Sequence, residues 1–205
     1  MNKADFFRLW SNLHGNAKIS GVVKGWLRIS YLLVNPLAKL KITPNILTML
    51  GLLFGVLLYL NAHSNWAVIL LTLSLICDGI DGSLAIITSK ASKWGAVLDS
   101  VVDRVTEFFW ALTFIAIGAN KYVVVAALLI ASVQEYLRAR VGGLGLSEVG
   151  VVTIAERPVR ASILFVALIA NILNLEIINI LAIAWLIMQS ISFLTITNFA
   201  YKKLN

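Results

Sequence analysis

Four aspartates lie close together in sequence that is otherwise apolar enough for membrane helices, within "CDGIDGSLAIITSKASKWGAVLDSVVDR". Asp78 and Asp81 are three residues apart. Asp99 and Asp103 are four residues apart, so each pair is expected to share one face of its helix. If these helices form an antiparallel hairpin around the polar turn at Lys90, the two pairs lie at the same level. The sequence therefore predicts that all four carboxylates converge.

Such a cluster predicts a bound divalent cation. Carboxylates held this close would repel one another and lose hydration, so most would be protonated unless a cation neutralised them. Oxygen ligands favour Mg²⁺, or Mn²⁺, over zinc, which prefers His and Cys. Four carboxylates suffice for two ions, and Mg²⁺ held in this way typically binds phosphate oxygens. Glycines at 79, 82 and 95 favour the same interpretation, since a ligand can approach where no Cβ obstructs it.

The composition predicts the kind of protein that positions these residues. The 205-residue chain is 60% hydrophobic and 13% charged, whereas soluble domains have roughly 25% charged residues. We therefore expect an integral membrane protein of the all-α class, because spanning helices need about 20 apolar residues each. Six transmembrane helices are predicted, at residues 45–61, 66–87, 94–117, 122–141, 158–175 and 177–200.

The basic residues predict the orientation. Residues 1–41 mix Trp, Phe and Leu with Lys and Arg, which predicts an amphipathic helix on the membrane surface ahead of a membrane domain at 42–205. Fifteen of the 17 Lys and Arg residues fall on the side that holds both termini. Cytoplasmic loops collect such residues, so both termini are expected in the cytoplasm. We assign the net charge of +7 to anionic lipid and an anionic substrate, and expect no nucleic-acid partner.

The aspartate stretch resembles the signature of the CDP-alcohol phosphatidyltransferase family, D-x2-D-G-x2-A-R-x8-G-x3-D-x3-D. Seven of its eight fixed positions are matched, by Asp78, Asp81, Gly82, Ala85, Gly95, Asp99 and Asp103. The departure is Ile86, where the family has arginine. Arg104 is a candidate substitute only because it adjoins Asp103 in the sequence.

The resemblance implies a reaction and roles for these residues. Family members move a phosphatidyl group from a CDP-linked lipid, CDP-diacylglycerol, to an alcohol, and CMP is released. Asp78, Asp81 and Asp99 are then expected to be metal ligands, and Asp103 to be both a ligand and the general base for the acceptor hydroxyl. The family also implies a six-helix fold with both ends inside, a homodimer, and an active site facing the cytoplasm at the cell membrane.

The resemblance also implies which residues contact the nucleotide. Gly82 and Ala85 match family positions that pack against it, where small side chains leave room, and Asp81 and Gly95 are expected to belong to the same site.

Four arginines are candidates for binding the acceptor: Arg138, Arg140, Arg157 and Arg160, which bracket a glycine-rich loop at 142–150. Their segments, "YLRARVGGLG" and "VVTIAERPVR", resemble the phosphatidylinositol-phosphate synthase branch, with phosphatidylglycerophosphate synthases close behind. Guanidinium groups suit phosphate, so we expect a phosphorylated polyol, inositol 1-phosphate first and glycerol 3-phosphate second. The alternative is that these arginines only follow the positive-inside rule.

Other interpretations stay open at this point. Glu107, Glu135 and Glu156 are expected to be partners of arginines rather than metal ligands. An ion-coupled transporter is the rival from another class, although such sites usually lie near the bilayer midplane between repeats. A catalytically inactive scaffold of the same fold would explain Ile86. Metal-dependent release of CMP separates the three.

Overall fold

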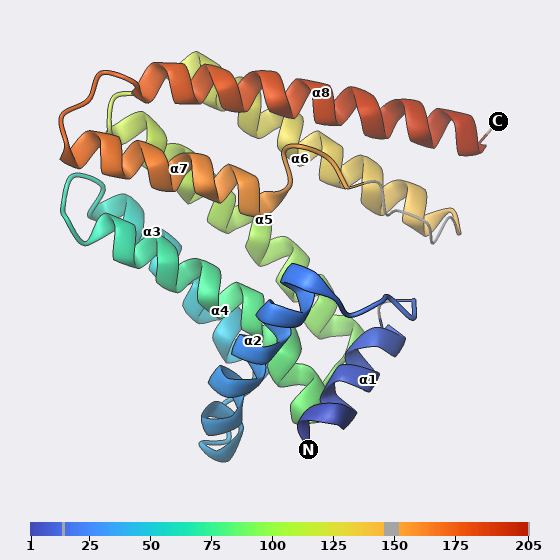
Figure 1. The fold of residues 1–205 in the computed structure, drawn as a ribbon. Coiled ribbons are helices and arrows are strands. Elements are labelled where there is room, and N and C mark those ends of the chain that lie inside the picture. The colour runs from blue at the N-terminus through green and yellow to red at the C-terminus, as the bar shows by residue number, and fades with distance from the viewer. Residues whose placement is uncertain (14, 146–151, 205) are drawn as a thin grey trace. The chain divides into compact units, whose positions relative to one another are not determined.

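The computed structural model describes residues 1–13, 15–145 and 152–204, and within these ranges the regular secondary structure is entirely α-helical (Figure 1). The helices of the described residues are α1 (Lys3–Leu13), α2 (Gly21–Lys39), α3 (Pro44–Leu60), α4 (Ala67–Ile87), α5 (Lys93–Ala116), α6 (Lys121–Gly143), α7 (Arg157–Ile172) and α8 (Ile178–Leu204). The all-α prediction is confirmed for this part of the chain. Residues 146–150 of the glycine-rich loop, together with residue 151, lie outside the described residues.

Each predicted membrane interval coincides with one of the helices α3 to α8, with ends that differ by a few residues. Three of them, α4, α6 and α8, are long and apolar enough to cross a membrane. The pair α2 and α3, bent by 111° at its break, makes a fourth span if it is counted as one. Helix α5 carries the aspartates, and α7 has only 16 residues, about 24 Å at 1.5 Å per residue. Three or four helices therefore fit a membrane span.

The N-terminal segment folds as two helices, α1 and α2, and not as the single surface helix predicted. The break between them contains Gly15 and Asn16, with φ angles of +65° and +61°. This left-handed conformation cannot continue an α-helix, and glycine and asparagine adopt it most readily. The apolar pattern alone did not indicate this turn.

The chain divides into two compact units. The first comprises Met1–Phe54 and Thr72–Thr106, and the second comprises Gly55–Leu71 and Glu107–Asn205. In the first unit, α2, α3 and α4 share an apolar core that includes Val34, Leu47 and Leu84.

The second unit is built around a buried ion pair. Arg160 is 4% exposed, and its Nε and Nη2 donate to Oε1 of Glu107 at 3.1 and 2.6 Å. Its Nη1 donates to the carbonyl oxygen of Ala155 at 2.7 Å. Nearby, Nε2 of Gln189 donates to Oε1 of Gln134 at 2.9 Å. The prediction that Glu107 partners an arginine is confirmed.

A second ion pair connects α6 to the segment before α7. Arg138 donates to both carboxylate oxygens of Glu156, at 2.9 and 2.6 Å, and lies 3.4 Å from Glu135. The backbone N–H and hydroxyl of Thr153 also donate to Glu156, at 2.8 and 2.7 Å. Burial raises the pKa of Glu156, but the hydrogen bonds from Arg138 and Thr153 outweigh it and lower the pKa to about 2. The predicted partners of Glu135 and Glu156 are confirmed.

The lowered pKa of Glu156 predicts a loss of stability in acid. The unfolded carboxyl titrates near its ordinary pKa of 4.5, so the stabilisation is complete above that pH and is lost as the pH falls toward about 2. At about 1.4 kcal/mol per pKa unit, it is on the order of 3 kcal/mol at pH 7. Glu156→Gln should therefore melt at a lower temperature than wild type at pH 7, and this difference should shrink in acid.

Melting of the detergent-solubilised protein between pH 7 and pH 3 measures this effect. The exposed Glu176→Gln is the matched control and should melt like wild type throughout. A Glu156→Gln protein that is as stable as wild type at pH 7 would contradict the assigned role.

Candidate active site

Helices α4 and α5 bring together three of the four aspartates. Asp78 on α4 and Asp99 and Asp103 on α5 each offer a carboxylate oxygen, and these oxygens all lie within 4.8 Å of one another. All three side chains are half-buried. The spacing of four residues on α5 places its two carboxylates on one face, as the sequence predicted. We call these three residues the carboxylate cluster.

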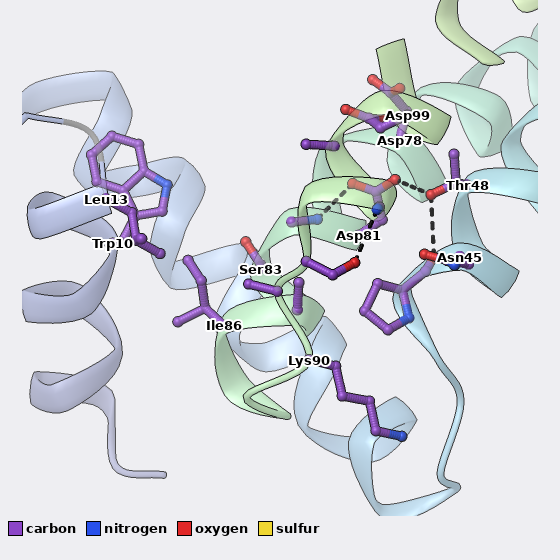
Figure 2. Close-up of a pocket in the computed structure, with 18 of the residues that line it drawn as sticks. Trp10, Leu13, Asn45, Thr48, Asp78, Asp81, Ser83, Ile86, Lys90 and Asp99 are labelled. Atoms are coloured by element: carbon purple, nitrogen blue, oxygen red, sulfur yellow. Dashed lines mark hydrogen bonds between the residues drawn. The ribbon is translucent and has the colours of Figure 1, made fainter. Parts of the chain in front are cut away.

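Asp81 lies outside the carboxylate cluster and is held by α3 instead (Figure 2). It is 7% exposed, and its Oδ2 accepts a hydrogen bond from the Thr48 hydroxyl at 2.6 Å. Its Oδ1 accepts from the backbone N–H of Gly82 at 2.5 Å. A step of three residues turns a helix by about 300°, so Asp81 points roughly 60° away from Asp78 around α4. A role for Asp81 as a metal ligand stays a prediction.

A cavity of about 410 Å³ in the first unit joins these carboxylates to the predicted nucleotide positions. Asp78, Asp81 and Asp99 line it, and so do Gly82, Ala85 and Gly95. A Cβ added to Gly82 would meet nothing within 4 Å, whereas one added to Gly95 would lie 3.1 Å from the Ser92 hydroxyl. The small residues therefore keep the cavity open. That they contact a nucleotide stays a prediction.

Further residues of this cavity were missed by the sequence analysis. Thr48 and Asn45 come from α3, and Lys90 comes from the turn between α4 and α5. Trp10 of α1 and Trp26 of α2 also line it, although tryptophans near a membrane are ordinarily interfacial anchors. Thr48 had a detectable signal, as a hydroxyl within an otherwise apolar helix.

The residue that departs from the family signature is part of an apolar cluster. Ile86 is 8% exposed and packs with Phe6 of α1 and Leu27 of α2. Arg104, the candidate substitute, has Nη2 3.9 Å from Oδ2 of Asp103. Arg104 therefore places positive charge at the carboxylate cluster, and Ile86 places none.

The four candidate acceptor arginines belong to the second unit and differ in their surroundings. Arg140 is exposed, whereas the Arg160 side chain is buried against Glu107. The Arg157 guanidinium lies 5.1 Å from the centre of the Trp110 ring and 3.8 Å from Glu107. Hydrogen bonds hold Arg138 on Glu156, as described above. Their binding of an acceptor phosphate stays a prediction.

The carboxylate cluster fits a hard divalent cation. Its three side chains offer only oxygen ligands, and Mg²⁺ and Mn²⁺ prefer such ligands. Three carboxylates this close are strongly repulsive without a positive charge between them. Asp78 and Asp99 also line the cavity, so a phosphorylated ligand in the cavity would lie next to an ion held by these carboxylates.

Comparison with known proteins places the chain in a family. Residues 41–197 match the CDP-alcohol phosphatidyltransferase family. The chain is 33% identical over 157 residues to the archaetidylinositol phosphate synthase of Pyrococcus horikoshii, covering 73% of this chain and 81% of that protein. It is 38% identical over 152 residues to the phosphatidylinositol phosphate synthase of Corynebacterium glutamicum, covering 66% of this chain and 68% of that protein.

The fold resembles that of the phosphatidylinositol phosphate synthase of Mycobacterium tuberculosis. The structure of that enzyme with manganese and citrate gives a TM-score of 0.68 at 19% identity and covers 84% of this chain and 88% of that one. The structure with CDP-DAG bound gives a TM-score of 0.65 at 19% identity and covers 85% and 94%. The match over residues 41–197 and the identity to the two synthases of Pyrococcus horikoshii and Corynebacterium glutamicum show that the chain belongs to the CDP-alcohol phosphatidyltransferase family.

Proposed function

We propose that the protein transfers the phosphatidyl group of CDP-diacylglycerol to a hydroxyl of inositol phosphate and releases CMP. The observation that carries this proposal is the carboxylate cluster at a nucleotide-sized cavity, in a chain of the CDP-alcohol phosphatidyltransferase family. Two relatives named as archaetidylinositol and phosphatidylinositol phosphate synthases support inositol phosphate as the acceptor. Glycerol 3-phosphate is the second candidate acceptor.

Two rival interpretations have less support. A transporter would need carboxylates that bind a transported or coupling ion. The three residues of the carboxylate cluster are instead signature residues of a family of transferases, to which the chain belongs. The inactive scaffold rests on the guanidinium that is absent at Ile86. All four signature aspartates are present, and the one departure, Ile86, has a packing role with Phe6 and Leu27.

The carboxylate cluster would hold the metal, Mg²⁺ or Mn²⁺, with two ions expected and with Asp81 as a further ligand. When bound, the metal neutralises the diphosphate and the charge that develops on the leaving CMP. In the proposed roles, Asp103 accepts the proton of the acceptor hydroxyl as this attacks the phosphorus. Gly82, Ala85 and Gly95 leave space for the nucleotide, and Thr48 orients the Asp81 carboxylate through its hydrogen bond.

The arginines would provide the charge that a phosphorylated acceptor requires. Arg140 is exposed and is proposed as a direct phosphate contact. Arg157, which lies beside the Trp110 ring and 3.8 Å from Glu107, is proposed as a second contact. Arg138 and Arg160 already donate to Glu156 and Glu107. To bind phosphate they would have to exchange partners, so we propose that their main role is to stabilise the second unit.

The membrane arrangement belongs to the same proposal. We propose six spans, α3 to α8, with residues 1–41 at the membrane surface and residues 42–205 as the membrane domain. Both termini would lie in the cytoplasm, which the distribution of basic residues supports. The active site would face the cytoplasm at the cell membrane, where the lipid tails stay in the bilayer while the head group meets the acceptor. A homodimer is proposed by analogy with the family.

The first prediction of this proposal is that Mg²⁺ or Mn²⁺ binds and stabilises the protein in the absence of substrate. Because the ion relieves the repulsion within the carboxylate cluster, a metal concentration 100 times its Kd should stabilise the fold by about 2.7 kcal/mol. Melting of EDTA-treated protein with and without added metal measures this. Asp78→Ala should remove the response, and an unchanged response in that variant would contradict the site.

The second prediction separates ligand from base. Asp78→Ala should lose binding of metal and CDP-diacylglycerol together, because its carboxylate is expected only to hold the ion. Asp103→Asn should keep substantial donor binding but turn over at least about 100-fold more slowly, as expected when a general base is missing. Donor binding and CMP release are measured on the same preparations. Near wild-type turnover by Asp103→Asn would show that another group accepts the proton.

The third prediction concerns the acceptor. Arg157→Ala should raise the KM for inositol phosphate by at least about tenfold, which is on the order of 1.4 kcal/mol for a lost charged contact, while the KM for the donor changes little. Initial rates at varied concentrations of each substrate separate the two effects. The exposed Lys121→Ala is the control for loss of a positive charge elsewhere. Unchanged acceptor KM in Arg157→Ala would assign this arginine to structure alone.

A further inference from the structure

The cavity of the first unit has two chemically different sides (Figure 2). Asp78 and Asp99 lie on one side, where the proposed function places the metal and the diphosphate. The other side is apolar and aromatic and comes from the two N-terminal helices. We call it the N-terminal wall; it consists of Trp10, Leu13, Trp26 and Leu27. The proposed reaction gives these residues no role.

Buried contacts fix the position of α1 at this wall. Phe6 is fully buried and packs against Leu27 and Ile86. Its ring centre lies 5.6 Å from that of Tyr31, whose hydroxyl donates to the carbonyl oxygen of Met1 at 3.0 Å. Trp10 follows Phe6 by four residues and shares its face of α1. The packing that buries Phe6 therefore also presents Trp10 to the cavity.

This packing gives Ile86 a physical explanation. Ile86 occupies the signature position where the family has arginine, and here its neighbours are Phe6 and Leu27. Phe6 and Leu27 offer a guanidinium no hydrogen-bond acceptor, so an arginine here would have to turn toward the cavity that Ile86 also lines. Isoleucine instead extends the apolar contact. The isoleucine that replaces the signature arginine is therefore also a residue through which α4 packs against α1.

Helix α2 packs closely against α4 at Gly79, between Asp78 and Asp81. A Cβ added to Gly79 would lie 2.6 Å from Cζ2 of Trp26, so the indole rests against the backbone between Asp78 and Asp81. Only glycine leaves room for this contact. An aromatic surface is thus built next to the turn of α4 that carries two signature aspartates.

We propose that the N-terminal wall binds the pyrimidine base of the donor nucleotide, with Trp10 stacking on the base and Trp26 forming the adjoining side. This inference rests on the proposed function, which places the diphosphate at the carboxylate cluster. Polar residues also line the rest of the cavity, but the aromatic faces of its lining come from Trp10 and Trp26. Indole rings stack on nucleobases, and the wall contains no charged side chain. Trp10 is then a determinant of donor recognition that lies outside the family signature.

The rival occupant of the wall is an acyl chain of the donor lipid. The cavity volume of about 410 Å³ lies near the lower end of the range for small-molecule sites, roughly 300 to 1,000 Å³. A nucleotide fills such a space without the lipid tails. Binding of CDP, which has the base and the diphosphate but no lipid, separates the two occupants.

The experiment measures the Kd of CDP by calorimetry on the 205-residue protein in detergent with Mg²⁺. Trp10→Ala and Trp10→Leu should each weaken CDP binding by about fivefold or more, because both lose the ring, while leucine keeps apolar bulk. Trp10→Phe keeps a stacking surface and should retain most of the affinity. Trp66→Ala, which removes a 66% exposed tryptophan from the second unit, should bind CDP like wild type.

Wild-type CDP affinity in both Trp10→Ala and Trp10→Leu would overturn the proposal. So would an increase in the KM for CDP-diacylglycerol without loss of CDP affinity, because the wall would then hold the lipid. If Trp10→Ala weakens the packing of α1, the difference in CDP affinity between Trp10→Leu and Trp10→Phe still measures the contribution of the aromatic ring. A wild-type protein that neither binds CDP nor releases CMP would contradict the proposed function as well, whereas an active wild type with unaffected variants contradicts only this inference.

Discussion

Repulsion among Asp78, Asp99 and Asp103 is the constraint on which the first unit depends. One oxygen of each lies within 4.8 Å of the others, in half-buried surroundings where water screens charge poorly. Helices α4 and α5 hold these side chains together across a short polar turn, and Arg104 lies 3.9 Å from Asp103. In the proposed function, a divalent cation would complete the charge balance, and the neighbouring cavity would give a phosphorylated ligand access to it.

Much of this arrangement could be predicted from the spacing of the aspartates and from the apolar intervals between polar breaks. The position of Asp81 could not, because its carboxylate is held by the Thr48 hydroxyl of α3, a contact between residues 33 positions apart. The division of residues 1–41 into α1 and α2 depends on left-handed backbone at Gly15 and Asn16, which an amphipathic pattern does not encode. The burial of Ile86 against Phe6 likewise requires knowledge of tertiary packing.

The arginines show the limit of reading charge from sequence. The positive-inside rule, an acceptor pocket and structural ion pairs all predict arginines near a membrane surface. In the second unit, Arg160 is bound to Glu107 and to a backbone carbonyl, and Arg138 is bound to Glu156, while Arg140 is exposed. Four residues of one type thus have different surroundings. The carboxylates that pair with Arg138 and Arg160 lie 18 and 53 positions away in the sequence.

The products of the reaction are the most direct test of the proposed function. The purified protein is incubated with CDP-diacylglycerol and Mg²⁺ and with inositol 1-phosphate, glycerol 3-phosphate, free inositol or serine, and the lipids and nucleotides are identified by mass spectrometry. The proposed function predicts CMP together with phosphatidylinositol phosphate in the first reaction and little product from the two unphosphorylated acceptors. Release of no CMP with any acceptor by folded, metal-loaded protein would contradict it, as would efficient use of free inositol or serine.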